Sequence, residues 1–206
     1  MTTAQQLPRG RHQLSREQIT GFQRDRMLRA MAEAMAERGY VGTPVAEIIR
    51  RAGVSRETFY QQFGSKQDCF VAALETALGR LSAAMEHTAL TQGSALERFD
   101  RLIGIYLEAL AAEPATARLF LIEIYAAGPD VMKRRSELQL QFVDGLVEIF
   151  HAHTEQGRFA CQALMAAIIS MVTTHIAAGD VAALRALRAP LVELVRCAPA
   201  ALISGR

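Results

Sequence analysis

Apolar residues recur at every third or fourth position along most of this 206-residue chain, and this spacing constrains the fold more than any other feature. The first such segment has the apolar stripe of an amphipathic helix, formed by Met27, Ala30, Met31, Ala34 and Met35. No segment shows the alternation of a half-buried strand, and no Asn-Gly or Asp-Gly hairpin turn occurs. We therefore expect an all-α fold.

Capping residues, Gly and Pro indicate where the helices begin and end. Ser15 with Gln18 predicts a capping box at the start of the first helix, and Gly39 predicts its end. At Thr43-Pro44 we expect a short second helix to begin, with Thr as the cap and Pro at the first helical position. Gly53 ends that helix. Seven further helices, which bring the total to about nine, are expected at about Ser55–Phe63, Lys66–Thr91, Ala95–Ala112, Ala115–Ala126, Asp130–His153, Phe159–Gly179 and Val181–Cys197.

Cysteine use and hydropathy disfavour a secreted or membrane protein. The three cysteines, Cys69, Cys161 and Cys197, are far apart and lack the close Cys/His spacing of a zinc site. The first fourteen residues contain no apolar run typical of a signal peptide. The most apolar stretch, Ala163 to Ala178, is shorter than the roughly 20 residues that span a bilayer. We therefore expect a cytoplasmic protein with no membrane partner.

Enzyme motifs are absent from the sequence. It contains no Gly-rich phosphate loop, no Gly-x-Ser-x-Gly elbow and no His-Glu-x-x-His pair. His151 and His153 would point to different faces of a helix, so they do not form a metal pair. We expect no metal, no cofactor and no catalytic activity.

Residues 45–63 have the pattern of two short helices joined by a tight turn. An amphipathic helix is followed by Gly53-Val54, where glycine lets the chain reverse, and then by a helix capped by Ser55. The second helix would expose polar groups able to bind base edges and phosphates. This pattern predicts a helix-turn-helix; the alternative is an ordinary corner of a helical bundle, whose polar side chains only meet water.

The wider segment from Phe22 to Asp68 resembles the DNA-binding domain of the TetR family of bacterial transcriptional regulators. The matching residues are Glu37-Arg38-Gly39-Tyr40, Thr43 to Ile48, Ala52 to Tyr60, and Gln61 to Asp68. Two residues depart from the family pattern. Ile49 stands where the family usually has a small Ala and should shift local packing, and Glu57 stands where Gly is frequent and bears on base preference.

The resemblance implies a role in DNA binding for the polar residues of this segment. Thr43, Pro44 and Ser55 would place free backbone N–H groups of two helix N-termini against phosphates. Arg56 would read a guanine, because its forked donors match O6 and N7. Lys66 would clamp a phosphate, unless it is a solvated first-turn residue. The other expected contacts are Glu57, Thr58, Tyr60, Gln61 and Gln62, with half-buried packing as the alternative for Tyr60.

The predicted helix at Phe159–Gly179 is apolar on more than one face, and the last predicted helix adds further apolar residues. The resemblance implies that these two helices form a four-helix bundle across a two-fold axis, and such modules commonly bind two half-sites as dimers. The alternative is that these helices only complete the core of the monomer. The expected interface residues are Leu164, Ile168, Met171, Val172, Leu184, Leu187, Leu191 and Leu194.

The middle helices are rich in aromatic and aliphatic residues, most of which must be plain core. The resemblance implies that some of them line a cavity for an apolar or amphipathic small molecule, with a few polar groups that fix its orientation. The expected lining residues are Phe99, Ile103, Tyr106, Phe120, Glu123, Ile124, Tyr125, Phe142, Leu146 and His175.

The charge distribution fits a chain of two parts with different partners. Residues 1–68 carry eleven Lys/Arg and seven Asp/Glu, whereas residues 69–206 carry twelve and fourteen. We expect a flexible basic arm at 1–14, a DNA-binding domain at 15–68, and a ligand-binding and dimerisation domain at 69–206.

The resulting hypothesis is a homodimeric repressor that binds a palindromic double-stranded DNA operator and is released by a small-molecule effector. The helix from Lys66 to Thr91 would couple the two sites. The alternative is a helical binding or adaptor protein that does not bind DNA, which lacks the steep salt dependence of phosphate contacts.

Overall fold

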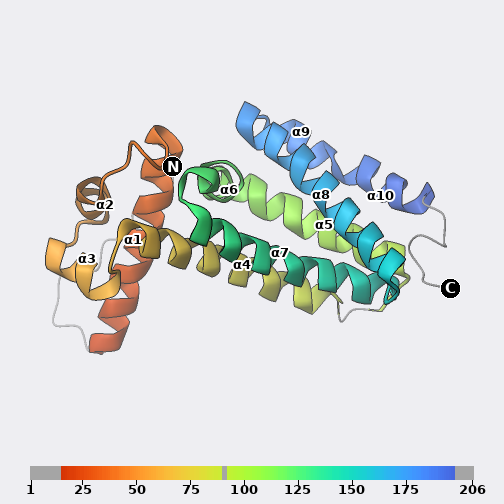
Figure 1. Ribbon diagram of the computed structural model, residues 1–206, viewed down its shortest axis with the longest axis horizontal. Coiled ribbons are helices and arrows are strands. Elements are labelled where there is room, and N and C mark those ends of the chain that lie inside the picture. Colours follow the sequence, from red (N-terminus) through yellow and green to blue (C-terminus); the bar gives the residue numbers. More distant parts are fainter. Residues whose placement is uncertain (1–14, 90–91, 198–206) are drawn as a thin grey trace.

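The computed structural model describes residues 15–89 and 92–197, and within these ranges the chain is helical without any strand. The all-α prediction is thus confirmed, while the expected arm at 1–14 lies outside the described residues. Figure 1 shows three helices grouped at one end and long helices running along the rest of the molecule. The elements are α1 (Arg16–Arg38), α2 (Val45–Ala52), α3 (Arg56–Gln62), α4 (Lys66–Ala89), α5 (Ala95–Ala112), α6 (Pro114–Leu121), the 3-10 helix η1 (Glu123–Ala126), α7 (Pro129–Phe150), α8 (Glu155–Ala178), α9 (Val181–Ala186) and α10 (Arg188–Cys197).

The ends of α1 agree with the sequence, but the start of α2 does not. The Ser15 hydroxyl accepts a bond from the Gln18 amide at 3.2 Å, and the Gln18 side chain accepts one from the Ser15 amide at 2.8 Å. In α2 the cap is Pro44, with no side-chain cap bond, so the prediction of Thr43 as the cap is wrong. The Thr43 side chain turns inward instead, as described below.

Three other predicted helices differ from the structure at identifiable places. The expected helix at Ala115–Ala126 is interrupted at Ile122, where α6 gives way to η1. The last expected helix divides at Leu187 into α9 and α10. The helix expected from Phe159 begins four residues earlier, because the Thr154 hydroxyl accepts a bond from the Gly157 amide at 3.1 Å and caps α8.

Helix α8 is longer than the apolar stretch seen in the sequence, and by length and composition it is long and apolar enough to cross a membrane. Core helices of other proteins pass the same test. Its inner face, which includes Cys161, Met165, Ile168 and Val172, is buried against the neighbouring helices of this chain. Core packing thus accounts for the apolar residues of this inner face only, because 28% of the apolar stretch of α8 is buried within this chain.

The buried side chains form two cores. The first joins α1, α2, α3 and the beginning of α4 around Phe59 and Phe70, and it also takes in Leu119, Ile124 and Val131 from beyond residue 110. The second core lies among α4 to α10. Because Leu78 of α4 packs against both cores, α4 connects the N-terminal helices to the rest of the molecule.

A cluster of charged residues fixes α2 against α1. Glu47, only 8% exposed, accepts bonds from Arg50 at 2.6 and 2.9 Å and from Arg51 at 2.7 Å. Arg51 also binds both carboxylate oxygens of Glu37, one of them at 2.8 Å. These arginine hydrogen bonds lower the pKa of Glu47 to about 2.

This cluster predicts a loss of stability in acid. The depressed pKa of the Glu47 carboxyl means that its contribution is present above pH 4.5 and is lost as the pH falls towards 2. We expect the urea midpoint of unfolding to fall over this range less steeply in Glu47→Gln than in the native chain. Glu33→Gln, an exposed position on α1, is the matched control. Parallel pH profiles for the native chain and Glu47→Gln would contradict this assignment.

Candidate nucleic-acid interface and internal cavity

Helices α2 and α3 form a helix-turn-helix. Gly53 ends α2 in the left-handed conformation with φ of 60°, which glycine adopts without a Cβ clash. Ile48, Ala52 and Phe59 fill the angle between the two helices and are almost completely buried. The chain therefore reverses over a packed corner that fixes α3 relative to α2.

The outer face of α3 is polar and open to solvent. Arg56, Glu57 and Gln61 are exposed, Tyr60 is 43% exposed, and Thr58 is half-buried, as is the neighbouring Gln62. The guanidinium of Arg56 lies 5.3 Å from the centre of the Tyr60 ring. Within the described part of the chain no carboxylate forms an ion pair with Arg56. This face thus offers a forked donor and amides at the surface of a helix that fits a major groove.

Four of the expected contacts already bond to one another on α3 and its N-cap. The Ser55 hydroxyl accepts a bond from the Thr58 amide at 3.0 Å and lies 2.9 Å from the Thr58 hydroxyl. Gln61 donates its side-chain amide to the Glu57 carboxylate at 3.2 Å. Ser55 therefore caps α3, and Glu57 orients Gln61 on the exposed face.

Thr43 and Lys66 are placed differently from the sequence expectation. Thr43 is fully buried, and its hydroxyl lies within bonding distance of the backbone carbonyls of Ala34 at 3.2 Å and Gly39 at 2.8 Å. The Lys66 ammonium donates to the carbonyls of Tyr40 at 2.7 Å and Thr43 at 3.1 Å. It also lies 4.1 Å from the centre of the Tyr40 ring, and partial burial lowers its pKa. Both side chains thus hold the loop between α1 and α2, whereas the sequence predicted a backbone N–H contact to phosphate at Thr43 and a phosphate clamp at Lys66.

The corrected role of Lys66 leads to a stability prediction. Lys66→Met would leave the carbonyls of Tyr40 and Thr43 without their charged donor, and we expect the free energy of unfolding to fall by ~1–3 kcal/mol in urea titrations. Lys133→Met removes the other lysine of the chain, which is exposed on α7, and should change it little. If Lys66→Met were as stable as the native chain, and the slope of log affinity for DNA against log salt concentration fell by about one, Lys66 would contact a phosphate as the sequence predicted.

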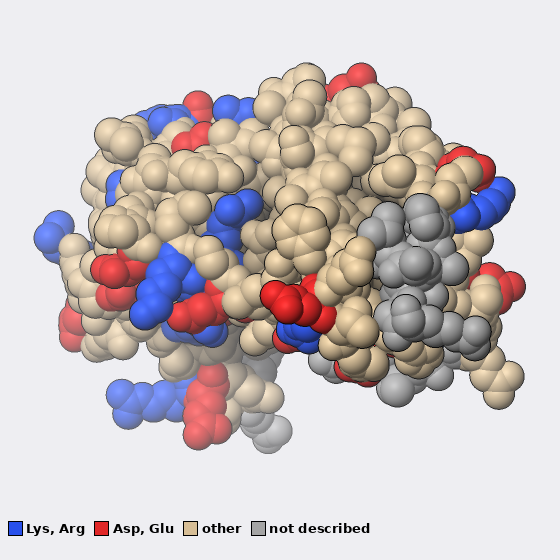
Figure 2. Space-filling view, turned by 45° about the vertical axis from the view of Figure 1, so that its right-hand side comes forward, with Lys and Arg blue, Asp and Glu red and all other residues tan. Residues whose placement is uncertain are grey.

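Charged side chains are concentrated on the N-terminal helices. In Figure 2 most of the blue Lys and Arg surface lies in the left half of the view, interspersed with red Asp and Glu, whereas tan surface dominates the upper part. Ion pairs account for much of this mixture, as between Arg51 and Glu37. The helix-turn-helix end therefore carries cations at its surface, as a phosphate-binding surface requires.

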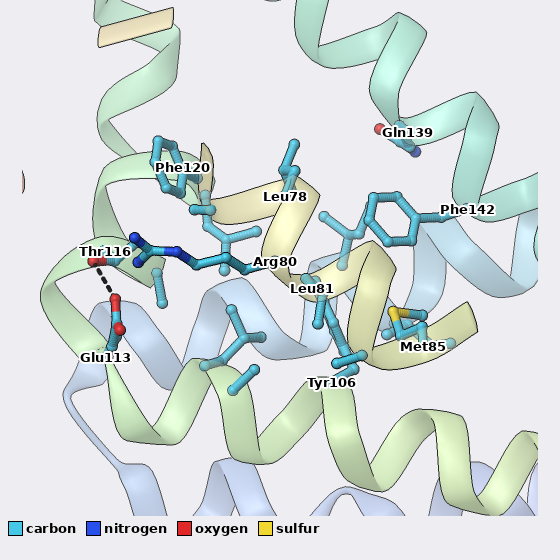
Figure 3. Close-up of a pocket in the computed structure, with 18 of the residues that line it drawn as sticks. Leu78, Arg80, Leu81, Met85, Tyr106, Glu113, Thr116, Phe120, Gln139 and Phe142 are labelled. Atoms are coloured by element: carbon cyan, nitrogen blue, oxygen red, sulfur yellow. Dashed lines mark hydrogen bonds between the residues drawn. The ribbon is translucent and has the colours of Figure 1, made fainter. Parts of the chain in front are cut away.

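An internal cavity of about 300 Å³ lies among α4 to α8. Its wall is mainly aliphatic and aromatic, and its polar members are Arg80, Tyr106, Glu113, Thr116, Arg135 and Gln139. Figure 3 shows side chains from α4, α5, α6 and α7 converging on this space, with the Thr116 hydroxyl bonded to Glu113 at 3.1 Å. A concave apolar site with few polar groups is typical of a small-molecule site.

The cavity includes half of the residues that the sequence predicted for it: Ile103, Tyr106, Phe120, Phe142 and Leu146. The other predicted residues lie elsewhere, which corrects their assignment. Phe99 packs on Phe150 in the core, Ile124 belongs to the first core, and Tyr125 is 62% exposed. His175 of α8 lies outside the lining, and Glu123 accepts a bond from the Tyr40 amide at 2.9 Å.

Sequence reasoning missed the contribution of α4 and the polar residues of α7. Helix α4 supplies Leu74, Leu78, Leu81 and Met85 to the cavity wall. Their i, i+4, i+7, i+11 spacing indicates an apolar stripe, but does not tell a cavity wall from a solid core.

The predicted dimer residues lie mostly inside the chain. Five of them pack within the second core and have no surface for a partner, which corrects their assignment: Ile168, Val172, Leu184, Leu187 and Leu191. Leu164 and Met171 are half-buried, and Leu194 is 52% exposed. On α8 the exposed residues between Phe159 and Ala178 are uncharged, and Phe159 itself is 69% exposed.

Comparison with known sequences supports the assignment of the N-terminal helices. Residues 27–73 match the family of bacterial regulatory proteins, tetR family. The fatty acid metabolism regulator protein of Bacillus subtilis (strain 168) is 25% identical over 174 residues, which cover 81% of this chain and 90% of that protein. The transcriptional regulator EthR of Mycolicibacterium smegmatis is 28% identical over 158 residues, covering 75% of this chain and 67% of that protein. Both relatives are named as regulators.

Solved structures share the whole fold. The fatty acid degradation regulator FadR of Bacillus halodurans superimposes with a TM-score of 0.76 at 22% identity, over 85% of this chain and 98% of that one. FadR of Bacillus subtilis, solved in complex with stearoyl-CoA, gives a TM-score of 0.75 at 24% identity, over 88% of this chain and 98% of that one. The arrangement of both the helix-turn-helix and the longer helices is thus common to these proteins.

Proposed function

We propose that this chain, whose residues 27–73 match the tetR family of bacterial regulatory proteins, is a cytoplasmic repressor that a long-chain acyl effector releases from a palindromic operator. The match of residues 27–73 to this family and the regulators among the relatives support a DNA-binding transcriptional regulator. The observation that carries the proposal is the exposed polar face of α3, held by the buried corner at Phe59. We divide the chain into a DNA-binding part at 15–68 and an effector-binding part at 69–206.

In this proposal, the side chains exposed on α3 contact the bases. Arg56 reads a guanine, while Gln61 and Gln62 reach bases or phosphates. Tyr60 contacts the DNA backbone through its hydroxyl. The backbone N–H groups at the start of α2, next to Pro44, and at the start of α3, next to Ser55, favour phosphates because they point out of the helix ends.

A homodimer would provide two copies of α3 for a palindromic site. The exposed apolar residues Phe159 and Leu194 and the uncharged outer face of α8 favour an interface there. They border an apolar groove lined by Ala160, Ala163 and Leu164 among others. This proposal replaces the buried leucines of α9 and α10 with residues that a second copy can reach.

The effector class follows from the cavity and from one structural neighbour. The cavity wall is mainly apolar, and FadR of Bacillus subtilis has been solved with stearoyl-CoA. A long alkyl chain gains about 0.8 kcal/mol for each CH₂ group that it buries. We infer that this chain takes an acyl compound of similar length.

Two connections link the cavity to the helix-turn-helix. Helix α4 lines the cavity with Leu74 to Met85 and begins at Lys66, which binds the loop before α2. Helix α6 lines it with Phe120 and leads to Glu123, which accepts the bond from the Tyr40 amide of the same loop. An effector that binds more tightly to a conformation with a different spacing of α4 and α6 would shift this loop. DNA affinity would then fall by the ratio of the effector's affinities for that conformation and for the DNA-binding conformation.

The test is selection of bound fragments from a random pool of DNA duplexes, followed by gel-shift titration. We expect a palindromic sequence whose affinity falls steeply between 50 and 200 mM salt, roughly in proportion to the number of phosphates neutralised. Stearoyl-CoA should then release the duplex. An absence of binding to any duplex would favour the alternative of a helical adaptor. If stearoyl-CoA left the affinity for the duplex unchanged, the proposed acyl effector would be wrong.

A further inference from the structure

Two uncharged polar side chains line the apolar cavity without a hydrogen-bond partner in the described part of the chain. They are Tyr106 of α5 and Gln139 of α7. Of the other polar residues in the wall, Thr116 bonds to Glu113, and Arg80 is exposed. Unsatisfied polar groups in a low-dielectric space cost free energy, and a ligand that pairs with them recovers it.

Arg135 lies one helical turn before Gln139 on α7 and also lines the cavity. Its side chain is half-buried, and its guanidinium lies 5.3 Å from the centre of the Tyr125 ring. No carboxylate of the described residues forms an ion pair with it, whereas the neighbouring Arg134 pairs with both Glu75 and Glu137. Arg135 therefore brings an uncompensated positive charge to the same wall.

All three residues line the cavity, and each carries hydrogen-bond donors. Burial raises the pKa of the Tyr106 phenol to about 12, so the hydroxyl stays protonated and neutral at physiological pH. The Gln139 amide has two N–H donors, and the Arg135 guanidinium has five. Three donors around an otherwise apolar space suit an oxygen acceptor attached to a long hydrocarbon chain.

We propose that Tyr106, Gln139 and Arg135 form a subsite that binds the acyl oxygen of a long-chain carboxylic acid or of its thioester. This assignment rests on the acyl effector proposed above and names the side chains that recognise it. The alkyl chain lies along the apolar wall, which includes Leu146, Met165 and Ile168. No specific contact recognises the alkyl chain. The subsite makes the cavity selective for acyl compounds over alkyl compounds of equal length.

The part of the ligand beyond the acyl group extends out of the cavity on the side where the lining residues are exposed to solvent. These residues include Arg80 on α4 and Ala109, Ala112 and Glu113 on the opposite side. In Figure 3 Arg80 extends from α4 towards the side where Glu113 and Thr116 lie. A carboxylate and a thioester share the acyl oxygen, but only a thioester has a bulky group that must pass this opening.

The experiment compares three probes by isothermal titration calorimetry of the full chain without DNA: stearoyl-CoA, S-octadecyl-CoA and stearate. S-octadecyl-CoA is a thioether that keeps the chain and the nucleotide but lacks the acyl oxygen. We expect the native chain to bind stearoyl-CoA roughly tenfold more tightly than the thioether, the range of one or two net hydrogen bonds. Tyr106→Phe should remove about three- to tenfold of that preference while leaving thioether affinity unchanged. Tyr60→Phe, on an exposed tyrosine of α3 that lies outside the cavity lining, is the matched control.

The outcomes separate the subsite from the proposed function. If Tyr106→Phe loses affinity only for stearoyl-CoA or only for stearate, the subsite is supported. The compound affected is the acyl compound that the subsite binds. Equal loss for the thioether and stearoyl-CoA would reduce Tyr106 to a packing residue and overturn the assignment, as would a native chain without preference. If stearoyl-CoA still releases the DNA duplex in those two cases, the proposed function stands without this subsite. Failure of all three probes to bind would overturn both the subsite and the acyl effector, while DNA binding is measured independently.

Discussion

Replacing Arg56 by alanine is expected to weaken binding of the selected duplex by ~1–3 kcal/mol, roughly a 5- to 150-fold loss. Arg56 is exposed at the start of α3, and its donors face no carboxylate that would compete with a base. The loss should be concentrated at one guanine of each half-site. Gel-shift titrations on the selected duplex and on single-base variants measure both quantities.

Two further variants separate base reading from general charge. Arg56→Lys keeps the positive charge but loses the fork, so discrimination at that base should fall while the salt slope stays near its native value. Arg185→Ala removes an arginine on α9, where it pairs with Glu108, and should leave DNA affinity almost unchanged. A native affinity for Arg56→Ala, or an equal loss for Arg185→Ala, would contradict the assignment of α3 as the reading helix.

Replacing Phe59 by alanine is expected to lower the free energy of unfolding by about 3–5 kcal/mol. The Phe59 ring is fully buried and contacts Tyr60 and Phe63, with ring centres at 5.4 and 5.5 Å. Its removal opens a cavity between α2 and α3 that the short α3 cannot fill by itself. Because native domains are stable by only about 5–15 kcal/mol, urea unfolding followed by circular dichroism will resolve the change.

The matched control for Phe59 is the residue that follows it. Tyr60→Phe removes only a hydroxyl from a ring that is 43% exposed, so its unfolding free energy should change by less than about 0.5 kcal/mol. A change of less than about 1 kcal/mol in Phe59→Ala would mean that α3 does not depend on this corner. The packing on which the proposed DNA interface rests would then be wrong.

Local chemistry explains which parts of the fold could be predicted. The bounds of α1 follow from a capping box and Gly39, and those of α5 from Ser94 and its bond with Glu97. These signals act within four residues, so they are legible in a single sequence. The break at Ile122 and the division at Leu187 carry no comparable local signal, and the expected helices ran through both.

The side chains with long-range partners could not be placed in the same way. Lys66 is recognisable as a lysine at a helix start, but its contacts with Tyr40 and Thr43 are 26 and 23 residues away. Glu123 looked like a polar group for a ligand, and it binds an amide 83 residues away. An apolar stripe likewise predicts burial without telling which neighbour covers it, as the buried leucines Leu184 and Leu191 illustrate.

By itself the sequence determined the helical class, the turn at Gly53 and the polar composition of α3, because periodicity, capping and glycine conformation are local properties. Only the tertiary structure decided which apolar residues enclose the cavity, which lie in the solid core and which remain on the surface. It also decided that Tyr106 and Gln139 share one space, because a contact between α5 and α7 depends on how whole helices pack.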